Sequence, residues 1–306
     1  FFQHFEGDIY SPVEDSVRRN KGEFFTPTPF VDLAHKYINE TFGYDWKERF
    51  IVWDCAWGTG NLTRDYKFKE LYCSTLEQSD IDTANQMNYN PESIKFKFDF
   101  LNDDDSKLPV GLINTIESGK EILFLINPPY ATARQDKNET KSKVGVAKNK
   151  VNKEMIEFNF GEATKNLYTQ FLYRIIKMNI SKNIKIAMFS PNLFLTSTSF
   201  KKFNSFIKEN ININGGYIMN SSNFDGVSNW IISFTIFSNE NEKSDKFDVV
   251  VYDEQEFEIK TIGHKVFNIM TEDRACDWIK LKKKIKITVP NLSSTLKVRE
   301  TNKKGI

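Results

Sequence analysis

Residues that commonly bind metals or form disulfides are scarce in this chain of 306 residues, which contains three cysteines and three histidines. Cys55, Cys73 and Cys276 lack the paired spacing of a disulfide framework or a zinc site. This scarcity is typical of a protein from a reducing compartment, and we expect a cytoplasmic location. Because thiol and imidazole ligands are so few and so scattered, the sequence also predicts no bound metal.

Long hydrophobic runs are absent as well. No run approaches the roughly eighteen apolar residues that a membrane-spanning helix needs, and the chain does not open with a signal peptide. Apolar residues make up 40% of the chain and charged residues 27%, as in soluble globular proteins. We therefore expect no membrane partner, and a chain length that allows one large domain or two smaller ones.

The chain also lacks an overall excess of charge, since its net charge is +1, and this excludes a protein that is basic throughout. The charge is nevertheless uneven, with seven Lys/Arg against two acids in residues 132–153 and nine against one in residues 280–304. Such local basic stretches either face a phosphate backbone or are solvated loops and tails. Residues 131–165 show little hydrophobic pattern before Met155, and we predict a long basic loop there.

The most informative motif is Asn127–Tyr130, with the sequence Asn-Pro-Pro-Tyr. It follows the apolar run Ile122–Ile126, which predicts a buried strand of a parallel sheet. The two prolines end that strand because neither can donate to the ladder. The turn therefore presents an amide, rigid carbonyls and a ring at the carboxyl edge of a sheet, where α/β folds bind ligands. This favours binding of a planar ring that carries an amine; an ordinary strand-ending turn with a core tyrosine is the alternative.

Three earlier predicted strands also end in polar residues. Phe50–Trp53 precedes Asp54 and a turn with Gly58 and Gly60, Leu71–Leu76 precedes Glu77, and Phe96–Phe98 precedes Asp99 and Phe100. Glycines let the backbone pass close beneath a ligand, carboxylates bind ribose diols, and an acid beside a ring suits adenine. The ordered set therefore predicts a nucleoside-bearing cofactor across the sheet edge, beside a second planar ligand.

The remaining pattern predicts alternating helices and strands. Helices are expected at residues 29–40 (capped by Thr26 or Thr28), after an Asp80 cap, at 167–178 and at 200–210. Strands are expected at 184–189, then as a closing antiparallel pair at 213–219 and 230–237, and as a small hairpin at 247–252 and 257–262.

As an ordered set, Gly22–Pro27, Asp54–Leu62 and Asn127–Tyr130 resemble the gamma class of N6-adenine DNA methyltransferases, as in type I and type II restriction-modification systems. The resemblance covers about residues 20–238. It implies an α/β, Rossmann-like class I methyltransferase fold, with a seven-stranded, mostly parallel sheet, an antiparallel last strand, and helices on both faces. It also implies S-adenosylmethionine as the cofactor and double-stranded DNA as the partner.

The resemblance implies roles for individual residues. The cofactor-binding residues would be Thr26, Asp54, Ala56, Gly58, Gly60, Glu77, Gln78, Asp99 and Phe100. The residues that act on the target adenine would be Asn127, Pro128, Pro129, Tyr130 and Phe224, with Phe224 opposite Tyr130 across the base. Cys55 and Trp57 depart from the Pro and Cys that are usual in the glycine turn of this class.

We predict a catalytic domain at residues 1–240, with an N-terminal cover at 1–20 and the basic loop at 131–165. Residues 241–306 would be a C-terminal extension, the start of a truncated DNA-recognition region, so that recognition depends on a further domain or subunit. The alternatives are a protein glutamine N5-methyltransferase, which also uses Asn-Pro-Pro-Tyr, an RNA amine methyltransferase, and a catalytically silent DNA-recognition subunit. The sequence does not predict the recognition site or an attached nuclease.

Overall fold

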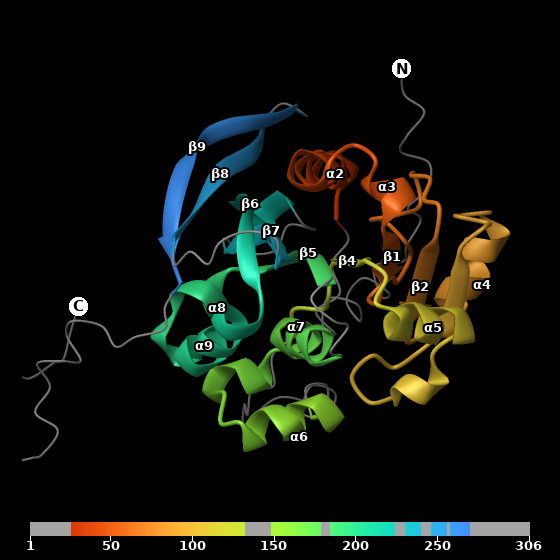
Figure 1. The fold of residues 1–306 in the computed structure, drawn as a ribbon. Helices are drawn as coiled ribbons and strands as arrows, with labels where there is room; N and C mark the ends of the chain where they lie inside the picture. Colours follow the sequence, from red (N-terminus) through yellow and green to blue (C-terminus); the bar gives the residue numbers. More distant parts are fainter. Residues whose placement is uncertain are drawn as a thin grey trace, which may run out of the picture. The chain divides into compact units, whose positions relative to one another are not determined.

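A computed structural model describes residues 26–131, 148–178, 184–223, 230–239, 246–255 and 258–269, all within the compact unit Phe1–Glu272. These residues form one sheet with flanking helices, in which α2 lies on one side of the central strands and α7 on the other (Figure 1). The strands are β1 Ile51–Asp54, β2 Leu71–Thr75, β3 Ile94–Lys97, β4 Ile122–Ile126, β5 Ile184–Pro191, β6 Asn212–Asn220, β7 Ile231–Ser238, β8 Lys246–Gln255 and β9 Glu258–Asn268.

The order of the strands across the sheet is β3-β2-β1-β4-β5-β7-β6-β8-β9. Strands β1 to β5 pair in parallel, and β7 runs antiparallel to both β5 and β6. The predicted α/β architecture is therefore confirmed, including the antiparallel strand and the closing pair β6–β7. The sheet differs from the expectation in size, because β8 and β9 extend it beyond seven strands.

The central strands form because almost every side chain in them is buried. All five residues of β4 and all four of β1 are buried, which is typical of parallel strands covered on both faces. Trp53 of β1 packs in this core against Phe124 of β4, with ring centroids 5.1 Å apart, and its indole N–H donates to Ser74 Oγ at 3.0 Å. Strand β3, at one edge of the sheet, has exposed or half-buried residues throughout.

The helices lie near the predicted positions, with local differences. They are α2 Thr28–Phe42, α3 Trp46–Arg49, α4 Gln78–Gln86, α5 Val110–Ser118, α6 Lys150–Glu157, α7 Leu167–Lys177, α8 Leu193–Thr196 and α9 Lys201–Asn210, with 3-10 turns η1 Asp105–Lys107, η2 Gly161–Lys165, η3 Thr198–Phe200 and η4 Ser221–Asn223. The two predicted caps are wrong. Pro27 precedes α2 without a side-chain cap, and Asp80 lies within the first turn of α4, where it accepts from Thr75 Oγ1 at 2.6 Å.

The predicted loop at residues 131–165 is wrong in its second half, because α6 and η2 lie there. Asn149 caps α6 by accepting from the backbone N–H of Asn152 at 2.8 Å, and Val151 and Met155 lie one turn apart in the core. Residues 132–147, which carry four of the seven Lys/Arg of the basic stretch at 132–153, lie outside the described residues.

The predicted hairpin near residue 250 is present as β8 and β9, and it is longer than expected. Strand β8 pairs in parallel with β6, so the sheet continues past residue 240, where the change in composition predicted a boundary. The compact unit likewise extends to Glu272. The assignment of residues 241–306 to a recognition region stays a prediction.

The topology reverses between β1 and β4. From β1 the chain builds outward through β2 and β3, and it then returns to place β4 on the other side of β1. Helices that leave neighbouring strands in opposite directions create a crevice at the carboxyl ends of those strands. Asp54 ends β1 and Asn127 follows β4, so both residues lie at this crevice.

Candidate active site

A cavity of about 430 Å³ lies at the carboxyl ends of β1 to β4. Of the predicted site residues, those that line it are Thr26, Asp54, Ala56, Gly58, Glu77, Asp99, Phe100, Asn127 and Pro129. Gly60, Gln78, Pro128 and Tyr130 lie outside the lining, and Phe224 lies outside the described residues. The size suits a small organic ligand, and the lining combines apolar rings with a few polar groups, as ligand sites do.

Asp54 brings a buried carboxyl group to this cavity. Its side chain is 1% exposed, and it accepts from the backbone N–H of Ala56 at 3.1 Å. Burial raises the pKa of this carboxyl to about 8, although the Ala56 N–H favours the charged form. The group is therefore mainly neutral at pH 7 as it stands, and a cationic ligand group beside it would favour the carboxylate.

The glycine turn after β1 is built around Trp57, which departs from the usual residue of the class that this chain resembles. Its indole N–H donates to Thr63 Oγ1 at 3.0 Å. A Cβ on Gly60, whose φ is +81°, would lie 2.8 Å from the indole nitrogen. Gly60 therefore makes room for the Trp57 indole, and its predicted contact with the cofactor stays a prediction. Gly58 does line the cavity, and a Cβ there would meet nothing within 4 Å.

Two predicted cofactor residues follow β2. Glu77 is exposed and lines the cavity, so its carboxylate is accessible to a ligand. Gln78 is also exposed, but its amide donates to Asp82 at 3.0 Å along α4. The structure therefore brings Glu77 to the cavity and not Gln78, whose predicted contact with the cofactor stays a prediction.

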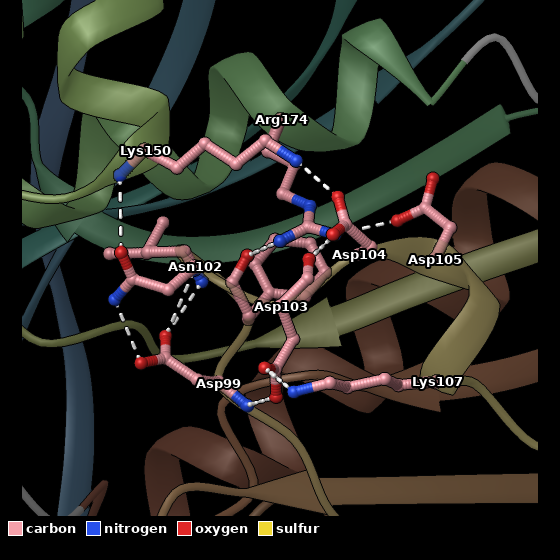
Figure 2. Close-up of polar contacts among 10 residues, drawn as sticks. Asp99, Asn102, Asp103, Asp104, Asp105, Lys107, Lys150 and Arg174 are labelled. Carbon is pink, nitrogen blue, oxygen red and sulfur yellow. Dashed lines mark hydrogen bonds and ion pairs between the residues drawn. The ribbon is translucent and has the colours of Figure 1, made fainter.

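Asp99 lies at the start of the acidic loop, which we define as Asp99–Asp105 (Figure 2). Its carboxylate accepts from the backbone N–H of Leu101 at 3.0 Å, and from the backbone and side-chain nitrogens of Asn102 at 3.1 and 2.8 Å. These bonds fix the orientation of the carboxylate. A carboxylate has about four acceptor positions, so Asp99 can still accept from a ligand amine.

Phe100 contributes to an aromatic wall. It is buried and stacks on Phe171 of α7, with centroids 5.0 Å apart and an interplanar angle of 18°. Phe98 also lines the cavity. The predicted ring at position 100 is therefore accompanied by Phe171, which the sequence reading assigned only to the apolar face of a helix.

At the Asn-Pro-Pro-Tyr turn, three side chains are joined by hydrogen bonds. Asn127 Nδ2 donates to Thr26 Oγ1 at 2.9 Å, and Tyr130 Oη donates to Asn127 Oδ1 at 2.6 Å. Burial raises the pKa of the Tyr130 hydroxyl, which therefore stays protonated and donates. Thr26 is 101 residues from Asn127 in the chain, so the fold alone brings these two side chains together.

Tyr130 is 5% exposed and belongs to an aromatic group that the sequence did not reveal. Its ring meets Tyr168 at 6.4 Å and 87°, and Trp230 at 6.1 Å and 69°. Other residues of the lining to which sequence reasoning gave no role at the site include Asn61, Thr75, Asn102, Asn149 and Leu167. A signal existed for Asn149, because a helix cap before apolar residues four apart predicts a helix start.

Among the residues that the structure describes, no group of three His, Cys, Asp or Glu side chains is arranged to hold a metal ion. The helices in the described part of the chain are all too short or too polar to cross a membrane.

Neither a family model nor a curated protein sequence matches this chain. Solved structures do. A DrdV–DNA complex has a TM-score of 0.53 and 15% identity, over 78% of this chain and 28% of that one. The type IIG restriction endonuclease BpuSI has a TM-score of 0.53 and 14% identity, over 84% and 32%. The methyltransferase subunit of a type I restriction-modification system from Streptococcus thermophilus has a TM-score of 0.51 and 16% identity, over 78% and 50%.

The fold is the class I methyltransferase fold. At these identities the likeness establishes the fold and nothing finer. The chain spans half or less of the length of these three structures.

Proposed function

We propose that this protein transfers a methyl group from S-adenosylmethionine to the N6 amine of an adenine in DNA, within a restriction-modification system. The observation that carries the proposal is the position of Asn127. It follows β4 at the topological switch point and lines the same cavity as Asp54. The side chain that would accept hydrogen bonds from the target amine and the carboxyl group that would hold the cofactor thus line one cavity, as group transfer would require.

The cavity residues fit S-adenosylmethionine, whose amino group and sulfonium are both cationic. The buried Asp54 carboxyl has a pKa near 8, so a cation is the group that it would accommodate best. Asp54 and the turn through Ala56 and Gly58 would hold the methionine part. Glu77 would accept from the ribose hydroxyls, and Asp99 would accept from the amine of the adenine.

When bound, S-adenosylmethionine supplies a methyl group activated by the positive sulfur. Asn127 Oδ1 and the Pro128 carbonyl would each accept one N–H of the target amine. Because the lone pair of an aromatic amine is delocalised into the ring, two such acceptors favour a pyramidal nitrogen and stabilise its developing positive charge. The bond from Asn127 Nδ2 to Thr26 Oγ1 fixes the orientation of the amide.

The target base must leave the duplex to reach such a site. We propose that Tyr130 stacks on the flipped base and that Phe224 contacts its opposite face. The Lys-rich loop after Ala131 would contact phosphates and position the duplex.

DNA as the substrate is supported by the solved structures, which include a DrdV–DNA complex and a type ISP restriction-modification enzyme, LlaBIII, bound to DNA. This chain spans 28% and 19% of those two proteins. We therefore propose that a further domain or subunit supplies sequence recognition.

The test is transfer of labelled methyl to unmethylated bacterial DNA, followed by digestion to nucleosides and mass spectrometry. Wild-type protein should produce N6-methyladenine, and Asn127→Ala should lower kcat by about a hundredfold or more while the Kd of S-adenosylmethionine stays within about threefold. The matched control is Asn210→Ala, at the surface end of α9, which should keep wild-type activity.

Other products would overturn the proposal in distinct ways. Label on protein glutamine would favour the glutamine methyltransferase, and label on RNA would favour an RNA substrate. Absence of S-adenosylmethionine binding in wild-type protein, measured by calorimetry, would favour a silent recognition subunit.

A further inference from the structure

The proposed chemistry gives a role to Asp99 but none to the three aspartates that end the acidic loop, Asp103, Asp104 and Asp105. Asp103, Asp104 and Asp105 succeed one another immediately after a segment that lines the cavity, Phe98–Asn102. Such a run of like charges is unfavourable unless cations or N–H donors compensate it. One compensating cation, Lys107, comes from η1, and two others come from α6 and α7, which follow in the chain after residues 132–147 (Figure 2).

Arg174 of α7 makes the central contacts. Its side chain is 11% exposed, and its guanidinium donates to the Phe100 carbonyl, to the Asp103 carbonyl at 2.8 Å, and to Asp105 Oδ1 at 2.6 Å. The guanidinium carbon also lies 5.0 Å from the ring centroid of Phe100. A mostly buried guanidinium is costly unless its N–H groups are bonded, and here three acceptors from one loop bond it.

The first turn of α6 contacts the same loop. The backbone N–H of Lys150 donates to Asn102 Oδ1 at 3.1 Å, and Lys150 Nζ pairs with Asp104. Asn102 in turn donates to Asp99 Oδ2 at 2.8 Å. A continuous set of hydrogen bonds therefore joins α6 to the carboxylate that is predicted to receive the cofactor adenine.

Two of the Arg174 acceptors are main-chain carbonyls, so this residue fixes the path of the backbone and does more than balance charge. Lys107 offers a contrast. It pairs with Asp103 from within the same part of the chain, four residues away, and its side chain is 64% exposed. Its ammonium therefore compensates the loop charge without joining the loop to another element.

We propose that Arg174 is a positioning residue that fixes the Phe98–Asn102 wall of the cavity and thereby sets the affinity for the nucleoside half of the cofactor. This inference rests on the proposed function. Arg174 acts through the loop and through Phe100, so it should affect cofactor binding and not the transfer step at Asn127.

The experiment uses the full chain and compares Arg174→Met with Lys107→Met, because each removes one cation that contacts the acidic loop. Calorimetry gives the Kd of S-adenosylmethionine and of S-adenosylhomocysteine, and transfer assays give kcat at saturating cofactor and DNA. Arg174→Met should raise the Kd of both ligands by the same factor, about tenfold, since the Phe98–Asn102 wall would contact the nucleoside half, which the two ligands share, and not the methyl group. The kcat of Arg174→Met should stay within about twofold of wild type. Lys107→Met should keep kcat and the Kd of both ligands within about twofold of wild type.

A merely structural role would lower the melting temperature and the binding stoichiometry without changing Kd, and that result would overturn the proposal. Equal weakening by Lys107→Met would also overturn it, because charge alone would then explain the effect. If Arg174→Met does not fold, Arg174→Lys and Asp105→Asn replace it. Either of them should raise Kd about threefold, and wild-type Kd values in both would refute the positioning role.

This outcome is separable from failure of the proposed function. If wild-type protein binds no S-adenosylmethionine, the function and the inference both fail. If wild-type protein binds and Arg174→Met binds equally well, only the inference fails.

Discussion

The buried carboxyl of Asp54 makes the stability of the ligand-free protein depend on pH in an unusual direction. Its pKa is about 8 in the folded protein, against 3.8 as the ordinary value. Between these values the folded state keeps a proton that the unfolded state releases, so rising pH favours unfolding. Most surface carboxylates that accept hydrogen bonds act in the opposite direction, because their folded-state pKa is lowered.

The magnitude follows from linkage. One proton retained on folding lowers the free energy of unfolding by about 1.4 kcal/mol per pH unit, and so by about 3 kcal/mol between pH 5 and pH 7. The stabilisation of the folded protein by the protonated Asp54 carboxyl is fully present below pH 4, and it is lost as the pH rises through 8. Asp54→Asn should remove this slope, since the amide oxygen can still accept from Ala56 and has no proton to lose.

The assay is urea denaturation of wild type and Asp54→Asn at several values between pH 5 and pH 8, without ligand. The variant should become more stable relative to wild type as the pH rises. Asp82→Asn, an exposed carboxylate on α4, is the control and should follow the wild-type slope. If the difference in the free energy of unfolding between wild type and Asp54→Asn stays constant across this pH range, the reasoning is refuted.

Gly60→Ala should lower the free energy of unfolding by about 2 kcal/mol, because its φ of +81° and the Trp57 indole at 2.8 Å both oppose a Cβ. Urea denaturation tests this prediction. The control is Gly263→Ala, whose Cβ meets nothing within 4 Å, and it should change the free energy of unfolding by less than about 0.5 kcal/mol. Equal effects of the two substitutions would contradict the packing argument. Thr26→Val should lower kcat about tenfold by removing the hydroxyl that orients the Asn127 amide, whereas Thr26→Ser should keep kcat within about twofold. A wild-type kcat in the valine variant would exclude this positioning role.

Local sequence patterns predicted the fold well because the positions of apolar residues along the chain indicate which side chains are buried. The run Ile122–Ile126 is apolar at every position, and all of its side chains are buried in β4. The same holds for the strand that ends at Asp54. Parallel strands bring their carboxyl ends to one edge, so an ordered series of acids after strands predicted which residues would gather at the cavity.

Local patterns failed where a short apolar signal lies in a polar segment, and where the decisive contact lies far away in the chain. The polar composition before Met155 concealed α6, whose core contacts depend on two residues one turn apart, Val151 and Met155. The change in composition near residue 240 concealed the continuation of the sheet, because the pairing of β8 with β6 is a tertiary choice. Thr26 resembled a helix cap, yet its hydroxyl bonds to Asn127 instead.

The sequence by itself therefore determined the strands, their order of appearance, and the polar residues at their ends, since these depend on burial and on turn chemistry over a few residues. Only the tertiary structure decided what each side chain contacts. The absence of a Cβ on Gly60 makes room for the Trp57 indole, and Phe171 stacks on Phe100 in the aromatic wall. Arg174 holds a loop about seventy residues away, since a guanidinium with several donors bonds whichever acceptors the fold brings within reach.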